Sequence, residues 1–453
     1  MAVCLKLKDI PMEYFQTIIN SLTLIPTEKE EPFFKKKQNF YKTPKDPIVM
    51  YHIENDNIYL PYRYACSLFN TIFNHNKNHL KIINNHQPEF KAMLRDYQVP
   101  QALKSLEYVK AYSTVTLGLP PGEGKTMLGS WLIYMLELMF LVIVPREKLI
   151  GQWWETFNKS IPAIASRIYR VGEPYNSSLS PVGFICMDTR IHLIPKEYKP
   201  FIGTIIYDEI HMLCTPSSVK TLLPSEIEPK YMIAETATLE RNDGMHTMAQ
   251  TIVGMHGIFK ISDKPYKVYR INTDVMVEET SGKRGLDFTD LIKKLAADNL
   301  YNYVILNIIK TNLQHKYIIL TRLAEHANNL CTWLRAMGIS ADTLVGSKNN
   351  YNDSKVLIGT IGKISTGFDE ENACPNYEGI RSNVLIITPS VKEYQLFEQS
   401  RGRVMRSNNP IVVWISPKNK VINNHFYGLK NWISETNGEI ITQKFVDNQT
   451  FIT

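Results

Sequence analysis

The feature that most constrains the fold of this chain is an apolar segment that runs into a glycine-containing loop and then into a helical pattern. Residues 113–136 read "STVTLGLPPGEGKTMLGSWLIYML". The first seven residues are typical of a buried strand, the prolines and glycines are typical of a loop, and the apolar residues after Lys125 recur at helical spacing. This order predicts an α/β domain with its loop at the carboxyl end of a strand.

Short apolar runs of the same kind recur on both sides of a polar stretch at residues 260–285. Helical patterns separate them, and this alternation is typical of parallel sheets covered on both faces. The runs lie at residues 140–144, 183–187, 203–209, 230–238, 315–321, 355–360, 383–388 and 411–416. The sequence therefore predicts an α/β fold with two parallel-sheet domains in tandem, divided near residue 265 and joined by the polar stretch.

Four regions follow from these patterns. Residues 1–88 alternate short apolar patches with charged residues, which indicates a small N-terminal domain of uncertain fold. We expect the first α/β domain at residues 89–262, the second at residues 263–435, and a C-terminal tail at residues 436–453.

Composition narrows the class of protein. A chain of 453 residues is too long for one core, and 44% hydrophobic residues are ordinary for a globular protein. The six cysteines form no CxxC pair, which argues against a zinc site or a disulfide framework and predicts reduced thiols in a cytosolic protein. The longest apolar run, at residues 131–145, contains Glu137 and is too short to cross a bilayer of about 30 Å. We therefore expect no membrane role, while a net charge of +7 permits a nucleic-acid partner.

The loop at residues 119–126 has the residue types that bind the phosphates of a nucleotide. Glycines allow backbone N–H groups to close on a phosphate, and the following helix adds its positive end. Lys125 would reach the β and γ oxygens, and the hydroxyl of Thr126 would bind Mg²⁺. Leu119 stands where the usual pattern has glycine, so the match departs at one position.

A second motif supplies the acidic residues that such a loop needs. The segment "GTIIYDEIHML" at residues 203–213 places Asp208 and Glu209 directly after an apolar run, at the expected carboxyl end of a strand. Asp208 would hold Mg²⁺ through water, and Glu209 would polarise the attacking water. The two motifs together predict binding and hydrolysis of a nucleoside triphosphate.

With the loop, the sequence Asp-Glu-Ile-His at residues 208–211 resembles the DExH branch of the superfamily 2 helicases. The resemblance continues in order over residues 94–406. Its further segments are "LRDYQ" (94–98), "VIVPREKLIGQWWETF" (142–157), "ETATLERNDG" (235–244), "YIILTR" (317–322), "VLIGTIGKISTGFDE" (356–370) and "QSRGRVMR" (399–406). The resemblance implies two RecA-like motor domains that close on ATP and grip a nucleic acid.

The resemblance also implies a role for individual residues. The implied catalytic residues are Lys125, Asp208, Glu209, Arg403 and Arg406. The implied nucleotide contacts are Gln98, Leu119, Pro120, Pro121, Gly122, Glu123, Gly124, Lys125, Thr126, Gly367 and Asp369. The implied nucleic-acid contacts are Pro145, Arg146, Thr189, Thr321, Arg322 and Thr360. The residues implied to couple the nucleotide to movement are His211, Thr236, Thr238 and Gln399, and the Mg²⁺ ligands are Thr126 and Asp208.

Three of these assignments, those of Arg403, Arg406 and Thr189, have an argument of their own. Arg403 and Arg406 lie far along the chain from Lys125, which is explained if the second domain brings them to the charge developing on the γ-phosphate. Two interpretations of Thr189 and its neighbour Arg190 are equally good: a contact with the nucleic-acid backbone, or a helix cap followed by a surface charge. Trp153 is expected in the core rather than stacked on a base.

Within superfamily 2, "LRDYQ" and "TATLERNDG" resemble the XPB/UvsW-like group. The short chain and its AT-rich coding bias resemble viral members, above all the poxvirus family of transcript-release helicases. That resemblance implies a DNA-dependent ATPase that unwinds DNA in the 3′-to-5′ direction. It would act with RNA polymerase or transcription factors to free nascent RNA, in the host-cell cytoplasm and the virion.

Two other functions stay open at this point. An RNA helicase of the DExH type shares every catalytic residue named above, although it would contact 2′-hydroxyl groups. A nucleic-acid clamp or polymerase-bound adaptor with a vestigial ATP site is the third possibility. The presence of Lys125, Glu209, Arg403 and Arg406 argues against such an adaptor.

Overall fold

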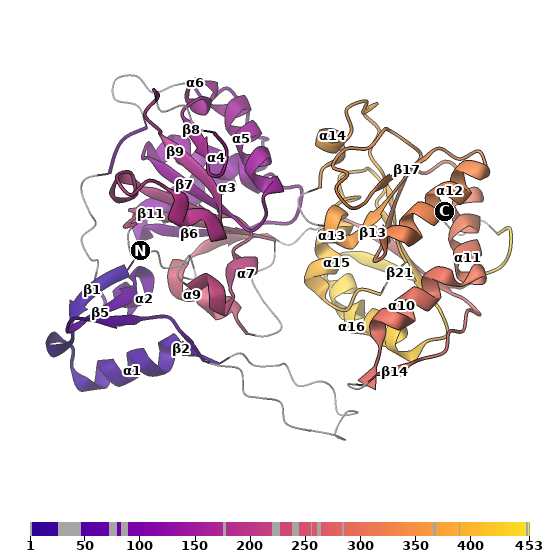
Figure 1. Ribbon diagram of the computed structural model, residues 1–453, viewed down its shortest axis with the longest axis horizontal. Helices are drawn as coiled ribbons and strands as arrows, with labels where there is room; N and C mark the ends of the chain where they lie inside the picture. The colour runs from indigo at the N-terminus through magenta and orange to yellow at the C-terminus, as the bar shows by residue number, and fades with distance from the viewer. Residues whose placement is uncertain are drawn as a thin grey trace. The chain divides into compact units, whose positions relative to one another are not determined.

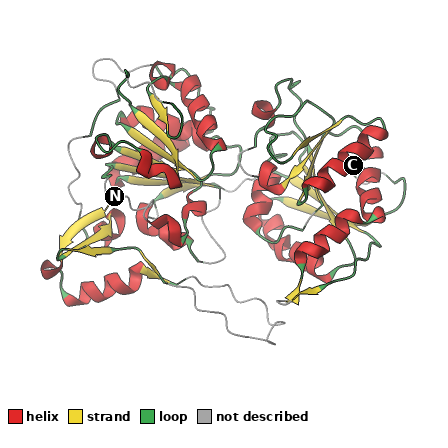
Figure 2. Cartoon of the chain, in the orientation of Figure 1, coloured by secondary structure: helices red, strands yellow, loops and turns green. Residues whose placement is uncertain are grey.

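The computed structural model describes most of the chain in two compact units. The described residues are 2–25, 47–71, 79–82, 89–174, 178–219, 227–237, 244–254, 256–260, 264–282, 285–365, 368–388, 390–449 and 452. The first unit comprises residues 1–119 and 123–260, and the second comprises residues 120–122 and 261–453. Each unit is built around one large sheet with helices packed on it (Figures 1 and 2).

The first unit contains a seven-stranded sheet in the order β12-β6-β11-β10-β7-β9-β8, and every pair of neighbours is parallel. Its strands are β6 (Thr114–Gly118), β7 (Phe140–Val144), β8 (Ile168–Arg170), β9 (Gly183–Met187), β10 (Thr204–Tyr207), β11 (Tyr231–Thr236) and β12 (Gly257–Phe259). Its helices are α3 (Gln98–Tyr112), α4 (Lys125–Leu136), α5 (Lys148–Ser160), α6 (Pro162–Ala165), α7 (Ile210–Leu213) and α9 (His246–Val253). Short 3₁₀ turns are η3 (Asp188–Leu193), η4 (Lys199–Phe201) and η5 (Pro216–Ser218).

Both faces of this sheet are buried, which explains why its strands read as continuous apolar runs. In β7, Leu141 and Ile143 join one hydrophobic core, while Phe140, Val142 and Val144 join the core on the opposite face. The period-two alternation of side chains thus supplies two cores from one strand.

The N-terminal segment packs onto one of these cores. It forms an antiparallel sheet in the order β1-β5-β4 together with two short helices. Its elements are β1 (Ala2–Lys6), η1 (Leu7–Asp9), α1 (Met12–Leu22), β2 (Thr23–Leu24), β3 (Ile48–Val49), β4 (His52–Glu54), β5 (Asn57–Pro61) and α2 (Tyr62–Leu68). Its buried residues, such as Ile18 and Leu60, belong to the same hydrophobic cluster as Leu141 and Ile143.

The second unit has a seven-stranded sheet in the order β17-β18-β16-β19-β20-β13-β21, again with parallel neighbours throughout. Its strands are β13 (Tyr266–Asn272), β16 (Tyr317–Thr321), β17 (Ala341–Leu344), β18 (Val356–Thr360), β19 (Val384–Ile387), β20 (Ile411–Ser416) and β21 (Gly438–Lys444). A small hairpin pairs β14 (Ser281–Gly282) with β15 (Gly285–Leu286). The helices are α10 (Phe288–Ala297), α11 (Asn299–Lys310), α12 (Ala324–Ala336), α13 (Ile361–Ile364), α14 (Glu370–Ala373), α15 (Tyr394–Arg401) and α16 (Lys420–Glu435).

Two strands of the second sheet lie outside the apolar runs that were predicted as its strands. The polar stretch at residues 260–285, predicted as a connection, contains β13, which lies between β20 and β21. Its polar residues gave the misleading signal, because Arg270 lies over the rings of Phe426 and Tyr427 instead of facing away from the protein. The segment after residue 435, predicted as a tail, contains β21, which extends the sheet by pairing with β13.

The predicted fold class is confirmed by this architecture. Two α/β units, each with a parallel sheet, follow one another along the chain, and the strands end at edges where loops carry the residues singled out in the sequence. In open parallel sheets the carboxyl edge is where ligands bind.

Candidate nucleotide and nucleic-acid site

The phosphate loop lies between β6 and α4 and depends on two glycines with positive φ. Gly122 has φ +91° and Gly124, directly before the helix, has φ +79°. This conformation disfavours residues with a Cβ atom. A Cβ on Gly124 would also lie 2.5 Å from Nε2 of Gln98. The backbone of the loop can therefore turn into the N-terminus of α4, where N–H groups point at an anion.

Gln98, the predicted adenine contact, is buried and holds the loop through its side chain. Its Nε2 donates to the carbonyl oxygen of Glu123 at 2.8 Å, and its Oε1 accepts from the backbone N–H of Arg95 at 2.9 Å. A residue of the upstream segment thus fixes the position of the loop. Glu123 is further tied to Lys260 by an ion pair at 3.2 Å.

Lys125 and Leu119 close the loop on itself. Nζ of Lys125 donates to the carbonyl oxygen of Leu119 at 2.9 Å, so the ammonium lies over the loop rather than in the solvent. The backbone N–H of Leu119 donates to the carbonyl oxygen of Thr236 on β11 at 3.1 Å. The departure from glycine at position 119 is accommodated, since the Leu119 side chain is fully buried in the core.

Asp208 follows β10 and is nearly buried beside the loop. Nε1 of Trp153 donates to its Oδ2 at 2.9 Å, and its backbone N–H donates to the carbonyl oxygen of Ile143 at 2.9 Å. Burial, and then the charge of Glu209, raise the pKa of Asp208 to about 7, although Trp153 and the charge of Lys125 act against the rise. A carboxyl group in this state gains from a cation that stabilises its ionised form.

Glu209 and the predicted coupling residues form one connected group. Glu209 has φ +47°, an unusual conformation for a non-glycine residue that turns the chain from β10 into α7. Nδ1 of His211 lies 3.4 Å from Oε2 of Glu209 and 2.9 Å from Oγ1 of Thr236, and His211 is buried. A change at Glu209 therefore has a direct path to β11. Thr238, the other predicted coupling threonine, lies outside the described residues.

A functional candidate that the sequence reasoning missed is Glu235, on β11 beside Thr236. It is fully buried, and within the described part of the chain neither carboxyl oxygen has a hydrogen-bond partner. Gly129 of α4 leaves room for it, because a Cβ there would lie 2.3 Å from Oε1 of Glu235. Burial, and then the charge of Asp208, raise the pKa of Glu235 well above its ordinary value. The signal in the sequence was a lone acid inside the apolar run "YMIAET".

These residues fit the predicted Mg²⁺ and ATP. Thr126 is the second residue of α4, and Asp208, Glu209 and Glu235 gather negative charge near Lys125. Among the described residues no group of three or more His, Cys, Asp or Glu side chains is arranged to enclose a metal. Mg²⁺ in nucleotide sites is held by one or two protein ligands, waters and the phosphates, and this arrangement can supply those protein ligands.

The predicted nucleic-acid contacts of the first unit follow neighbouring strands. Pro145 and Arg146 come directly after β7, and Thr189 and Arg190 lie in η3 directly after β9. Thr189 is exposed, while Arg190 pairs with Glu147 at 2.8 Å, which joins the two segments. The structure therefore brings these predicted contacts to one edge of the sheet.

In the second unit, Arg403 and Arg406 are held by the loop that follows β18. The guanidinium of Arg403 donates to the carbonyl oxygens of Phe368 and Ser365, and that of Arg406 pairs with Asp369. Gln399 is buried on α15. Gly367, a predicted nucleotide contact, lies outside the described residues.

The other predicted contacts of the second unit end the strands β16 and β18. Thr321 is buried, and its hydroxyl donates to the carbonyl oxygen of Leu323 at 3.1 Å, so it faces the protein. Arg322 donates to the carbonyl oxygen of Ser390 at 3.3 Å and lies over the ring of Phe288. Thr360 is half-buried and precedes α13. The three residues lie at the carboxyl edge of the adjacent strands β16 and β18, where Thr321 and Arg322 are held by contacts within the protein.

Comparisons with known proteins show which proteins this chain resembles. Residues 91–241, which carry the phosphate loop and Asp208, match the family described as "Type III restriction enzyme, res subunit". The chain is 27% identical to "Putative helicase 161L" of Invertebrate iridescent virus 6 over 84% of this chain and 88% of that protein. It is 28% identical to "DNA 3'-5' translocase XPB2" of Sulfurisphaera tokodaii over 43% of this chain and 44% of that protein.

A solved structure supports the fold. Saccharomyces cerevisiae Dbp5, in a structure with RNA and ADP BeF3, aligns over 76% of this chain and 93% of its own, with a TM-score of 0.51 and 13% identity. This likeness supports a RecA-like fold for both units, which follow one another along the chain. Separately, none of the helices among the described residues is long and apolar enough to cross a membrane.

The chain is therefore similar to helicases over most of its length, and its likeness to the XPB2 translocase agrees with the resemblance to the XPB/UvsW-like group of superfamily 2. Helicases of this superfamily are motors that depend on nucleic acid and hydrolyse ATP with Mg²⁺.

Proposed function

We propose that the chain is a DNA-dependent ATPase that moves along DNA in the 3′-to-5′ direction and opens duplexes. The observation that carries the motor assignment is the connected group of Lys125, Asp208, Glu209, His211 and Thr236, in which the hydrolytic residues are linked to β11. The choice of DNA rests on the likeness to the archaeal protein named as a DNA translocase.

In the proposed reaction, the first unit holds the nucleotide. Gln98 would contact the adenine, the N–H groups of residues 122–126 and Nζ of Lys125 would bind the phosphates, and Lys125 would leave the carbonyl of Leu119 to do so. Mg²⁺ bound at Thr126 and Asp208 would neutralise charge on the phosphate oxygens. Glu209 would accept a hydrogen bond from the water that attacks the γ-phosphate and take its proton, which yields ADP and phosphate.

The second unit would contribute the arginines. Arg403 and Arg406 would stabilise the charge on the transferred phosphoryl group, as planar guanidinium groups do in other nucleotide hydrolases. His211 would transmit the state of the nucleotide to Thr236 on β11, and Gln399 would have the same role in the second unit. Pro145, Arg146, Thr189, Thr321, Arg322 and Thr360 would contact the nucleic-acid backbone, which predicts weak sequence preference.

We further propose that this motor serves transcription by freeing nascent RNA from RNA polymerase in the host-cell cytoplasm and the virion. The support is the resemblance of its motifs to the transcript-release helicases. The test is RNA release from stalled elongation complexes of the cognate polymerase, with and without ATP, using Glu209→Gln as the inactive control. Release that is equal with both proteins would exclude an ATP-driven role.

The test of the substrate is steady-state ATP hydrolysis with no polymer, single-stranded DNA, duplex DNA and single-stranded RNA. We expect strong stimulation by DNA, little by RNA, and no hydrolysis by Glu209→Gln. Preferential stimulation by RNA would favour the RNA helicase instead, since that class shares the same catalytic residues. ATP hydrolysis that none of the polymers stimulates would contradict the assignment as a motor.

A further inference from the structure

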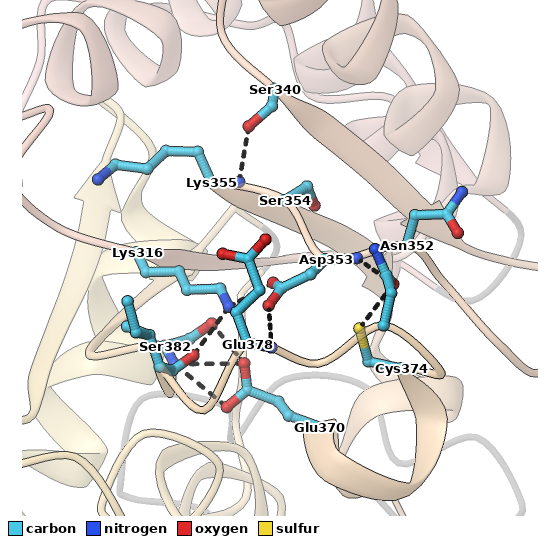
Figure 3. Close-up of polar contacts among 12 residues, drawn as sticks. Lys316, Ser340, Asn352, Asp353, Ser354, Lys355, Glu370, Cys374, Glu378 and Ser382 are labelled. Atoms are coloured by element: carbon cyan, nitrogen blue, oxygen red, sulfur yellow. Dashed lines mark hydrogen bonds and ion pairs between the residues drawn. The ribbon is translucent and has the colours of Figure 1, made fainter.

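A loop outside the helicase motifs is anchored firmly in the second unit. It runs from Cys374 to Asn383 between α14 and β19. Lys316, at the amino end of β16, donates to the carbonyl oxygen of Ile380 at 2.8 Å and pairs with Asp353 (Figure 3). Asp353 in turn accepts from the backbone N–H of Glu378 at 2.9 Å. The side chains of Lys316 and Asp353 are 11% and 5% exposed, so this anchor is shielded from the solvent.

The anchored loop presents Arg381 to the acidic residues at the start of α14. Nη2 of Arg381 lies 3.0 Å from Oε2 of Glu371, and Nη1 lies 3.6 Å from Oδ2 of Asp369. The guanidinium also lies over the ring of Tyr377, at 5.8 Å from its centroid. Because Glu371 is largely exposed, the contact with the more buried Asp369 is the one that we expect to matter.

Asp369 already has two other tasks. Its Oδ1 caps α14 by accepting from the backbone N–H groups of Glu371 at 3.0 Å and Asn372 at 3.3 Å. Its Oδ2 pairs with Nη1 of Arg406. One carboxylate oxygen, in a side chain that is 17% exposed, is therefore shared by two guanidinium groups.

We propose that Arg381 is a positioning residue for the motor reaction, which keeps Asp369 compensated while Arg406 moves between Asp369 and the nucleotide. The proposal rests on the proposed function of Arg406 and deepens it. If Arg406 alone balanced Asp369, its departure would leave a mostly buried carboxylate without a cation, which is unfavourable. With Arg381 in place, the charge on Asp369 stays balanced and the cap of α14 is kept.

The surroundings of Arg406 are consistent with such a movement. A cavity of about 890 Å³ borders the side chains of both Arg381 and Arg406. Other polar residues that line it include Lys316, Asp353 and Glu378. The anchor at Lys316 holds one side of this cavity fixed. Arg406 can therefore change position while Arg381 stays at Asp369.

The test compares the full-length parent with Arg381→Gln, Arg381→Lys and the control Arg335→Gln. The control is matched, because Asp342 is also shared by two cations, Arg335 at 3.4 Å and Lys348 at 2.7 Å, away from the motifs. We expect Arg381→Gln to lower the kcat of polymer-stimulated ATP hydrolysis about tenfold, with the KM for ATP unchanged. Arg381→Lys should restore most of the rate, and Arg335→Gln should behave as the parent does.

A second readout separates positioning from general structural support. In an Asp369→Asn background no carboxylate needs compensation, so adding Arg381→Gln should change kcat no further. An equal kcat for the parent and Arg381→Gln would overturn the inference while leaving the proposed function intact.

The inference also stays testable if the parent fails to hydrolyse ATP, which would refute the proposed function instead. Amide hydrogen exchange then decides, because Arg381→Gln should speed exchange at residues 369–373 and Arg335→Gln should not. Unchanged exchange in both variants would overturn the inference by this route.

Discussion

The ionisation of Asp208 lowers the free energy of unfolding of the first unit by a measurable amount. Burial, and then the charge of Glu209, raise its pKa from an ordinary 3.8 to about 7. An acid whose pKa is raised on folding keeps its proton longer in the folded state. Its ionisation therefore lowers the free energy of unfolding as the pH rises from about 4 to about 7. Asp208→Asn removes this ionisation and should stabilise the protein while abolishing hydrolysis.

The size of the effect follows from the two pKa values. One pKa unit corresponds to about 1.4 kcal/mol, so Asp208→Asn should gain about 4 kcal/mol in the free energy of unfolding at pH 8. At pH 5 the ionisation penalty is smaller, and the gain should be about 2 kcal/mol. The side chain of asparagine keeps an oxygen that can accept from Trp153, so the packing is largely preserved.

Urea unfolding without nucleotide and with a chelator tests this prediction, because no bound metal then offsets the charge. Amide hydrogen exchange in β10 identifies the first unit in the two-unit chain. Asp342→Asn is the matched control. Hydrogen bonds from Lys348 and backbone N–H groups outweigh burial and lower the pKa of Asp342, so its neutralisation should destabilise. An Asp208→Asn gain of equal size at pH 5 and pH 8, or no gain, would refute the reasoning.

Three further predictions concern the same site. Glu235→Gln should be more stable than the parent, and the difference should grow as the pH rises above 4.5, because burial raises the pKa of Glu235. Thermal unfolding from pH 5 to 8 measures this difference, and a difference that stays constant would contradict the prediction. Trp153→Phe removes a hydrogen bond that lowers the pKa of Asp208, so the acidic limb of the ATPase pH profile should shift to higher pH by about one pH unit. An acidic limb at the same pH as in the parent would contradict this. His211→Ala breaks the contact with Thr236 and should reduce polymer-stimulated hydrolysis more than basal hydrolysis; equal losses in steady-state assays would argue against coupling through His211.

Local patterns were sufficient to predict the two units with parallel sheets, although not every strand of the second sheet. Strands such as β7 and β10 are buried on both faces and therefore read as unbroken apolar runs, and the glycines of the phosphate loop are required by positive φ. β13 was missed because Arg270 is accommodated by aromatic rings rather than by the solvent, so burial does not show as hydrophobicity. Patterns of hydrophobicity report burial only where the buried residue is apolar.

The residues of the candidate site could likewise be predicted only in part from the sequence. Asp208 and Glu209 directly follow β10, and Lys125 begins α4 after the loop that follows β6, so their positions along the chain already indicate their place at the edge of the sheet. Glu235 and Arg381 depend on approaches between segments far apart in sequence, Glu235 on Gly129 of α4 and Arg381 on the anchor at Lys316. No local spacing encodes such an approach, so the surroundings of these residues are known only from the folded chain, although the lone acid in the run "YMIAET" marks Glu235 as unusual.

The central claim is that hydrolysis drives movement along DNA, and displacement of streptavidin from biotinylated single strands measures that movement. A motor that moves in the 3′-to-5′ direction should displace streptavidin from a 5′-biotin much faster than from a 3′-biotin, with ATP and not with the Glu209→Gln protein. DNA-stimulated hydrolysis without displacement from either end would contradict the claim, and faster displacement from the 3′ end would reverse the proposed direction.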